Sequence, residues 1–386
     1  MRKTAILFSL LLLFCSSHAQ HAWSFRAYPG FLAAHHEDMQ AMGSHVLGLE
    51  AAREWRIDRD GELAKKQLQP FAGIGANHIM MFNDINGNVS ALFGYYDAGI
   101  RGNEKTSLRF RLTTGVGMLS RQWDVYTNPR NRAIGSRFNG MMQAAMYVQT
   151  PVSDRKQLQL GLSLIHYSNG NFGQPNLGIN MPCLFLGLKQ FDGNNQHYKP
   201  RYPVNPNTVE WQPSLRFGKK QMSMDDPRNI FNYVAELKLL YPHKPWRFWT
   251  AAITGFYDRT YVYTKFQPLP NAGLDKISEL AISGGHEYRV GRVGMVADVG
   301  FYLYRPDDSK RKYYQALGVK YYASPSLTAM VRMRTHLSMA DYLEWGISYR
   351  IHTKAKVNPG FKEGFKWAFR GFKTPIKFRP IITPEF

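Results

Sequence analysis

The chain has 386 residues, of which 44% are hydrophobic and 14% aromatic, and its formal net charge is +21. Beyond the first residues, no stretch approaches the ~18 consecutive apolar residues of a membrane-spanning helix, which excludes a bundle of such helices. The excess of Lys and Arg favours an anionic partner, such as nucleic acid, an acidic polymer or a phosphate-rich membrane surface.

The first residues, MRKTAILFSLLLLFCSSHAQ, are typical of a secretory signal. A basic start precedes an apolar stretch, and residues 17–19 form a small-x-small cleavage site, so we expect residues 1–19 to be removed. Export argues against nucleic acid and favours the cell envelope as the partner. Cys15 leaves a lipoprotein anchor as the alternative, although Phe14 before it is bulkier than the usual small residue. The mature chain would keep only Cys183, and its stability would need a large core or a closed sheet.

Between residues 45 and 353, apolar and polar residues alternate with a period of two in about twelve to fourteen runs. Clear examples are the runs at 107–118, 291–304, 326–336 and 343–351. Each run has the ~10 residues that a tilted strand needs to cross a bilayer, more than the usual ~5–6. Arginines recur in the middle of the polar faces, which favours a wet lumen.

These runs predict an all-β fold, namely an antiparallel outer-membrane β-barrel of about 12–14 strands formed by residues 20–354. The alternative is a soluble β-sandwich, whose half-buried strands alternate in the same way. Loops rich in Asn, Pro and Gly, such as 128–136 and 192–207, separate the runs, and no internal repeat or interdomain linker is evident.

Residues 355–386 form a basic aromatic tail of different character. Within 361–373, four Phe residues recur at helical spacing with Lys and Arg between them. This pattern predicts a short amphipathic helix that ends before Pro375 and lies on a membrane surface. The alternative is a solvated tail packed against the base of the barrel.

The stretch HYSNGNFGQPNLGIN, residues 166–180, follows a run of leucines at 158, 160, 162 and 164. His166 and Ser168 continue the leucine face, which in a membrane barrel contacts lipid. Residues two apart on a strand are about 6.6 Å apart on one face. His166 could therefore take the proton of the Ser168 hydroxyl, as nucleophilic catalysis requires. His-x-Ser alone is a weak signal, because many polar strand ends carry it.

The longer pattern is more specific. His166-x-Ser168-Asn169-Gly170, followed by Pro175-Asn176-x-Gly178, resembles the outer-membrane lipid A 3-O-deacylase (PagL) family, also described as acyloxyacyl-hydrolase-like. The flanking segments HHEDM (35–39) and NRAIGS (131–136) are similar to longer relatives of that family.

The resemblance implies an outer-membrane β-barrel whose lipid-facing Ser–His–Glu site removes an ester-linked (3-hydroxy)acyl chain from lipid A. By the same resemblance, Ser168 is the nucleophile, His166 the general base and Asn176 an oxyanion-hole donor, while Asn169 and Gly170 shape the turn. No cofactor or metal is implied. The partners are lipid A or lipopolysaccharide and the outer membrane, where phosphates would meet Lys and Arg at the barrel rim.

The sequence departs from the family where the acidic third member is expected, twelve residues after the serine. Asn180 occupies this position. An Asn can orient the base as in Cys-His-Asn proteases, but it cannot offset the charge of the imidazolium. Three alternatives remain: Asn180 orients His166, a carboxylate such as Asp192 or Glu210 completes the site, or the site is inactive.

Other readings of the sequence carry less weight. His35-His36-Glu37-Asp38 could suggest a metal site, but adjacent histidines on an extended strand point to opposite faces. A non-enzymatic barrel, either a channel or a structural protein with a relic site, is the main alternative function. A soluble secreted β-protein that binds acidic polysaccharide is the third.

Overall fold

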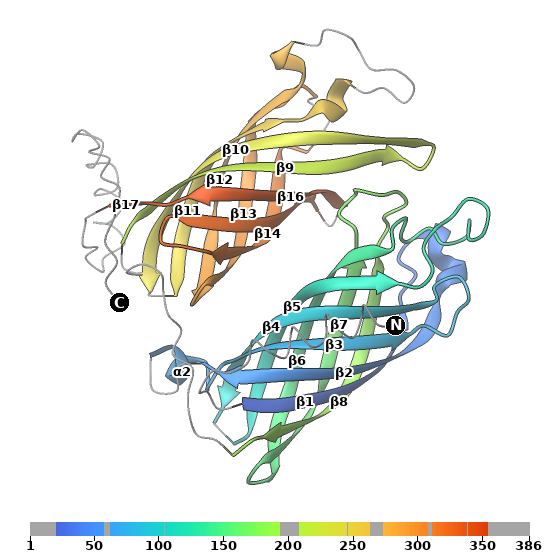
Figure 1. The fold of residues 1–386 in the computed structure, drawn as a ribbon, viewed down its shortest axis with the longest axis vertical. Coiled ribbons are helices and arrows are strands. Elements are labelled where there is room, and N and C mark those ends of the chain that lie inside the picture. The colour runs from blue at the N-terminus through green and yellow to red at the C-terminus, as the bar shows by residue number, and fades with distance from the viewer. Residues whose placement is uncertain are drawn as a thin grey trace.

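The computed structural model describes residues 21–57, 62–103, 105–193, 208–244, 246–262, 273–307, 311–337 and 339–353. Within these ranges the chain is almost entirely antiparallel β-strand. The strands form two closed barrels that lie side by side (Figure 1). Among the described residues, no helix has the length and apolarity to cross a membrane.

The first barrel contains eight strands, each paired with the next along the chain. They are β1 (His21–Leu32), β2 (Ser44–Arg56), β3 (Phe71–Met80), β4 (Asn88–Gly102), β5 (Ser107–Leu119), β6 (Phe138–Ser153), β7 (Lys156–Ser168) and β8 (Ile179–Phe191). Pairing of β1 with β8, from Ala22↔Phe191 to Gly30↔Cys183, closes the barrel. The short helices η1 (Glu37–Met42) and α2 (Glu62–Lys66) lie in two of the connections.

The second barrel closes because β9 pairs with both β10 and β16. Its strands are β9 (Glu210–Ser223), β10 (Asp226–Lys244), β11 (Arg247–Tyr257), β12 (Ser278–Val290), β13 (Val293–Tyr304), β14 (Tyr313–Tyr322), β15 (Leu327–His336) and β16 (Met339–Tyr349). The two-residue β17 (Ile351–His352) continues beside β9. Helices η2 (Arg259–Val262) and η3 (Leu274–Lys276) lie between β11 and β12.

The predicted antiparallel β-barrel class is confirmed, but the prediction of one barrel of about 12–14 strands over 20–354 is wrong. The described strands close twice, with eight strands in each ring. Alternation with a period of two sets the two faces of a strand but not its distant partner, so it does not reveal where a sheet closes. The predicted signal (1–19) and the predicted tail (355–386) lie outside the described residues.

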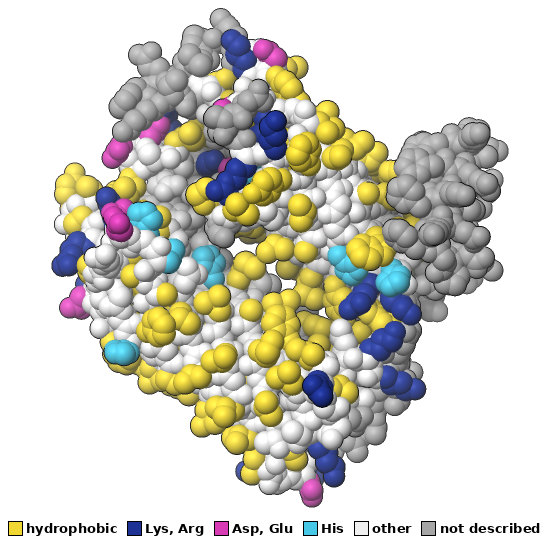
Figure 2. All heavy atoms as spheres, turned by 180° about the vertical axis from the view of Figure 1, so that it is seen from behind, with side chains coloured by type: hydrophobic (Ala, Val, Ile, Leu, Met, Phe, Trp, Pro, Cys, Tyr) yellow, Lys and Arg dark blue, Asp and Glu magenta, His cyan; other side chains and the backbone are white. Residues whose placement is uncertain are grey.

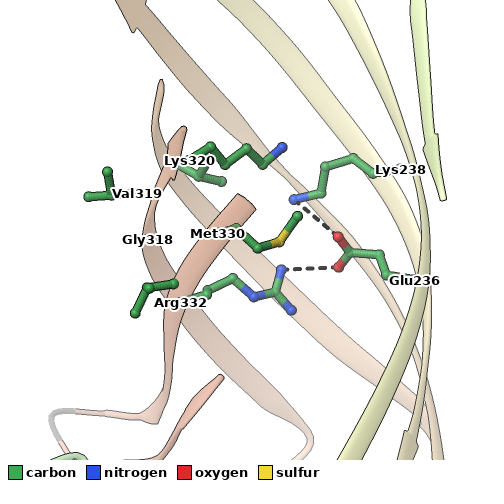
Figure 3. Close-up of a pocket in the computed structure, with 9 residues that line it drawn as sticks. Glu236, Lys238, Gly318, Val319, Lys320, Met330 and Arg332 are labelled. Atoms are coloured by element: carbon green, nitrogen blue, oxygen red, sulfur yellow. Dashed lines mark hydrogen bonds and ion pairs between the residues drawn. The ribbon is translucent and has the colours of Figure 1, made fainter. Parts of the chain in front are cut away.

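Both lumens are packed with paired charges. In the first barrel, Arg111 lies 2.7 Å from Glu50 and Arg109 lies 2.6 Å from Asp97. In the second, the Glu236 carboxylate is 3.0 Å from Arg332 and 3.6 Å from Lys238 (Figure 3). The cavity beside these groups measures only about 10 Å³, roughly the space of one water molecule. The inward arginines, from which the sequence predicted a wet lumen, are buried against carboxylates and aromatic rings.

Large hydrophobic side chains are exposed on the strands of both barrels. On the face shown in Figure 2, hydrophobic side chains also line a hollow between the barrels. The barrels meet at both ends. At the end opposite the β7–β8 connection, the Tyr96 hydroxyl of β4 hydrogen-bonds that of Tyr288 of β12 at 2.9 Å. Ile57, Leu63 and Trp246 are buried beside this pair.

Candidate active site

Ser168 and His166 lie at the end of β7 and face outward. Along this strand Leu160, Leu162 and Leu164 are 60%, 63% and 50% exposed, while the residues between them are at least partly covered. His166 and Ser168 continue the leucine side and are half-buried, whereas Tyr167 between them is buried in the barrel. The predicted orientation of the two side chains is confirmed.

His166 is held by Asn180, its cross-strand neighbour on β8. The ring Nδ1 of His166 lies 2.7 Å from Oδ1 of Asn180. An amide oxygen can only accept, so Nδ1 carries the proton and the neutral ring keeps Nε2 as its basic atom. Asn180 therefore orients His166 in the way that the sequence suggested as one of three alternatives.

His35, in the β1–β2 connection, fixes the other end of Asn180. Its Nδ1 lies 3.2 Å from Nδ2 of Asn180, and its Nε2 lies 3.0 Å from the carbonyl oxygen of Leu177. Nδ1 also lies 3.3 Å from the carbonyl oxygen of Ala33, but the Leu177 carbonyl at Nε2 is nearer. A carbonyl oxygen can only accept, so Nε2 of the neutral His35 ring donates to Leu177 and its Nδ1 accepts from the amide. This assignment leaves Oδ1 of Asn180 as the end that faces His166. The sequence did not identify His35 as a partner of the site.

The β7–β8 connection folds back over the strand end. The backbone N–H of Asn169 donates to Oδ1 of Asn176 at 2.9 Å, so the NH₂ end of Asn176 is a donor directed elsewhere. The Asn169 side chain donates to Ser136 Oγ at 2.9 Å and to the Gly173 carbonyl at 2.6 Å. The connection is thus tied to itself and to the β5–β6 connection.

Gly178 lies directly against the histidine ring. Its φ of +79° lies in the left-handed region, and a Cβ built there would be only 2.8 Å from Cε1 of His166. A larger residue would therefore be strained in its backbone and would displace the ring.

The two carboxylates that the sequence offered as substitutes for the missing acid lie elsewhere. Asp192 follows β8 at the opposite end of the first barrel, where it pairs with Arg53. Glu210 is buried in the second barrel, 2.8 Å from Arg289 and 2.7 Å from Arg350. Neither completes the site. Within the described parts of the chain, no cluster of three His, Cys, Asp or Glu side chains could hold a metal ion.

Comparison with known families divides the chain at the boundary between the barrels. Residues 45–189 match the family described as lipid A 3-O-deacylase (PagL), and residues 209–353 match the one described as acyloxyacyl hydrolase, C-terminal domain. The first match falls on the first barrel and the second match on the second barrel. No curated protein matches the sequence.

Several solved structures are similar to the chain. The crystal structure of the outer membrane enzyme PagL is 16% identical over 42% of this chain and 97% of its own, with a TM-score of 0.32. The translocator domain of the autotransporter NalP from Neisseria meningitidis is 11% identical over 91% of this chain and 95% of its own, with a TM-score of 0.21. The β domain of the Bordetella autotransporter Brka is 11% identical over 87% of this chain and all of its own, with a TM-score of 0.25.

Proposed function

The chain belongs to the lipid A 3-O-deacylase (PagL) family, and from this premise we propose that it is an outer-membrane esterase that removes an ester-linked (3-hydroxy)acyl chain from lipid A. Residues 1–19 would direct its export. One observation carries the proposal: His166 and Ser168 lie together on the outward, lipid-facing row of β7, and Asn180 sets the tautomer of His166. A polar pair in that position is costly unless it has a polar substrate.

In the proposed reaction, Ser168 Oγ attacks the acyl carbonyl carbon while its proton passes to Nε2 of His166. The oxygen of the tetrahedral intermediate gains a negative charge, and the Asn176 NH₂ group donates to it. The intermediate then expels the sugar oxygen, which takes the proton from His166. Water repeats the sequence on the acyl-enzyme and releases the fatty acid. Asn169 and Gly170 keep the turn that brings Asn176 back to the serine.

Asn180 would keep His166 oriented through both steps, because Nδ1–H stays bound to its Oδ1. An amide stabilises the imidazolium less than a carboxylate would, so we expect a slower enzyme than one with an acid at this position. The substrate would enter from the bilayer, along the leucine row that leads to Ser168.

Mass spectrometry of lipid A from cells that make the intact protein tests this proposal. Ser168→Ala is the test variant. Ser90→Ala is the matched control, because Ser90 of β4 also faces outward and its Oγ lies 2.8 Å from Nδ1 of His78. We expect lipid A to lose one hydroxyacyl mass with the intact protein and with Ser90→Ala, and to stay whole with Ser168→Ala. Unchanged lipid A despite correctly folded intact protein would contradict the function.

A further inference from the structure

The turn after Ser168 reaches across to the second barrel. The carbonyl oxygen of Gly170 accepts from the backbone N–H of Leu343 in β16 at 3.2 Å. The Asn171 side-chain NH₂ donates to the carbonyls of Ala340, at 2.8 Å, and Asp341, at 3.1 Å. Three hydrogen bonds therefore join the turn to the start of β16.

Strand β9 holds the same turn from a second side. The backbone N–H of Gln221 donates to the carbonyl of Asn171 at 2.9 Å, and Oε1 of Gln221 accepts from the N–H of Gln174 at 3.0 Å. Gln221 Nε2 donates to the carbonyls of Ser223 and Asp226, at 2.9 and 3.2 Å, so the β9–β10 turn fixes the side chain. The Gln174 side chain donates to Asn171 Oδ1 at 2.8 Å and completes the set.

The backbone of the turn depends on these contacts. Gly170 and Asn171 have φ values of +63° and +66°, in the left-handed region that disfavours most residues. A Cβ on Gly170 would lie 2.7 Å from Cε of Met333 and 2.9 Å from Cβ of Leu343. Gly and Asn tolerate this region, so the turn can form locally, and its direct contact with the second barrel then fixes where it lies.

We propose that the second barrel is a positioning element of the active site, and that Asn171 and Gln221 are its positioning residues. The inference rests on the proposed function. By holding residues 170–174, strands β9 and β16 keep Asn169 and Asn176 where the oxyanion of the substrate forms at Ser168. Small displacements at such a site are expensive, since about 1 Å can cost about a hundredfold in rate.

The test measures kcat and KM of the full-length protein in vesicles that contain lipid A. Each kcat is calculated per molecule of folded protein. Asn171→Gly keeps the left-handed backbone but removes the donor to β16. Gln221→Ala removes the acceptor for Gln174, whereas Gln221→Glu keeps that acceptor and loses the bonds to Ser223 and Asp226. Asn103→Gly is the control, because Asn103 shapes a turn at the opposite end of the first barrel.

We expect Asn171→Gly and Gln221→Ala to lower kcat about tenfold each with KM changed less than about twofold, as loss of transition-state geometry requires. Asn103→Gly should keep kcat within about twofold of the unmodified protein, since it loses no bond to residues 170–174. Gln221→Glu should keep a higher kcat than Gln221→Ala, since it retains the acceptor for Gln174 although its second oxygen faces the carbonyls of Ser223 and Asp226.

Three outcomes would overturn the inference. One is an active intact protein whose kcat is unaffected by Asn171→Gly and Gln221→Ala. A second is a Gln221→Glu variant as slow as Gln221→Ala, which would assign the loss to the β9–β10 turn. A third is an equal loss in Asn103→Gly, which would indicate a general effect of turn stability. An inactive, folded intact protein would instead contradict the proposed function itself.

Discussion

An amide beside His166 can present either its oxygen or its NH₂ group to the ring, and His35 determines which one. Because Nε2 of His35 donates to Leu177, its Nδ1 accepts from Asn180, and Oδ1 is left for His166. The opposite orientation would make Nδ1 of His166 an acceptor and place the proton on Nε2, where it blocks the transfer from Ser168.

Replacing His35 should therefore slow the reaction without removing any group that contacts substrate. A hydrogen bond contributes about 0.5–1.5 kcal/mol net, so His35→Ala should lower kcat about two- to tenfold. His35→Gln should restore most of the loss, because its amide can accept from Asn180 and donate to Leu177. Steady-state kinetics on lipid A in vesicles measures both. Equal rates for all three proteins would show that Asn180 needs no support from His35.

The sequence predicted most of the candidate site because its residues are close together along the chain. A single hairpin, β7–β8, carries His166, Ser168, Asn176 and Asn180. His35 was missed because it reaches Asn180 only after β1 pairs with β8, where Ala33 and Asn180 form a bridge. Nothing in the segment HHEDM itself marks that contact, and a metal site was considered there instead.

On the scale of one strand, β7 combines an outward row of leucines with the end that carries the proposed catalytic pair. Leu162 is in the middle of this strand and Leu158 is near its start, and both face outward. A lipid-facing arginine costs about 2–4 kcal/mol at the bilayer midplane and about 0–1 kcal/mol near the interface. Leu162→Arg should therefore lower the free energy of unfolding by about 2–4 kcal/mol, and the control Leu158→Arg by less than about 1 kcal/mol.

Denaturant unfolding in lipid vesicles, followed by tryptophan fluorescence, would measure this difference. Equal costs at the two positions would mean that the row does not cross the bilayer core at Leu162. In that case Ser168 would not be expected to face lipid either, because both positions follow from the same alternation along β7.

Strands and their faces were predictable for a related reason. An outer-membrane strand needs about ten alternating residues, and this pattern is complete within each strand. Barrel closure is a different kind of property, since it depends on pairs such as β1 with β8 and β9 with β16, which are far apart in sequence. The Asn- and Pro-rich segment at 192–207 separates the two barrels, but its composition is the same as that of an ordinary strand connection.

At the scale of the whole molecule, the proposed reaction and the contacts that hold the turn beside it belong to different barrels. The outward residues of β7 and β8 carry the proposed reaction, whereas β9 and β16 hold the turn that follows Ser168. The barrels also meet at the opposite end through Tyr96 and Tyr288. The two barrels are thus in contact at both ends, and one of the two contacts is the turn at residues 170–174.

The paired charges inside the two barrels argue against the alternative that the protein is a channel. In each barrel the inward charges form pairs, such as Arg111 with Glu50 and Arg332 with Glu236, and their side chains are buried. An ion passing through would have to separate buried pairs, and removing one partner of such a pair costs about 3–5 kcal/mol.

We therefore expect no steady conductance when the folded protein is inserted into planar bilayers. A porin in the same bilayer serves as the positive control, and heat-modifiable migration of the sample on a gel establishes that the barrels are folded. Stable conductance steps from the intact protein would show that the charge pairs open. A channel function would then explain the many inward arginines better than a closed barrel does.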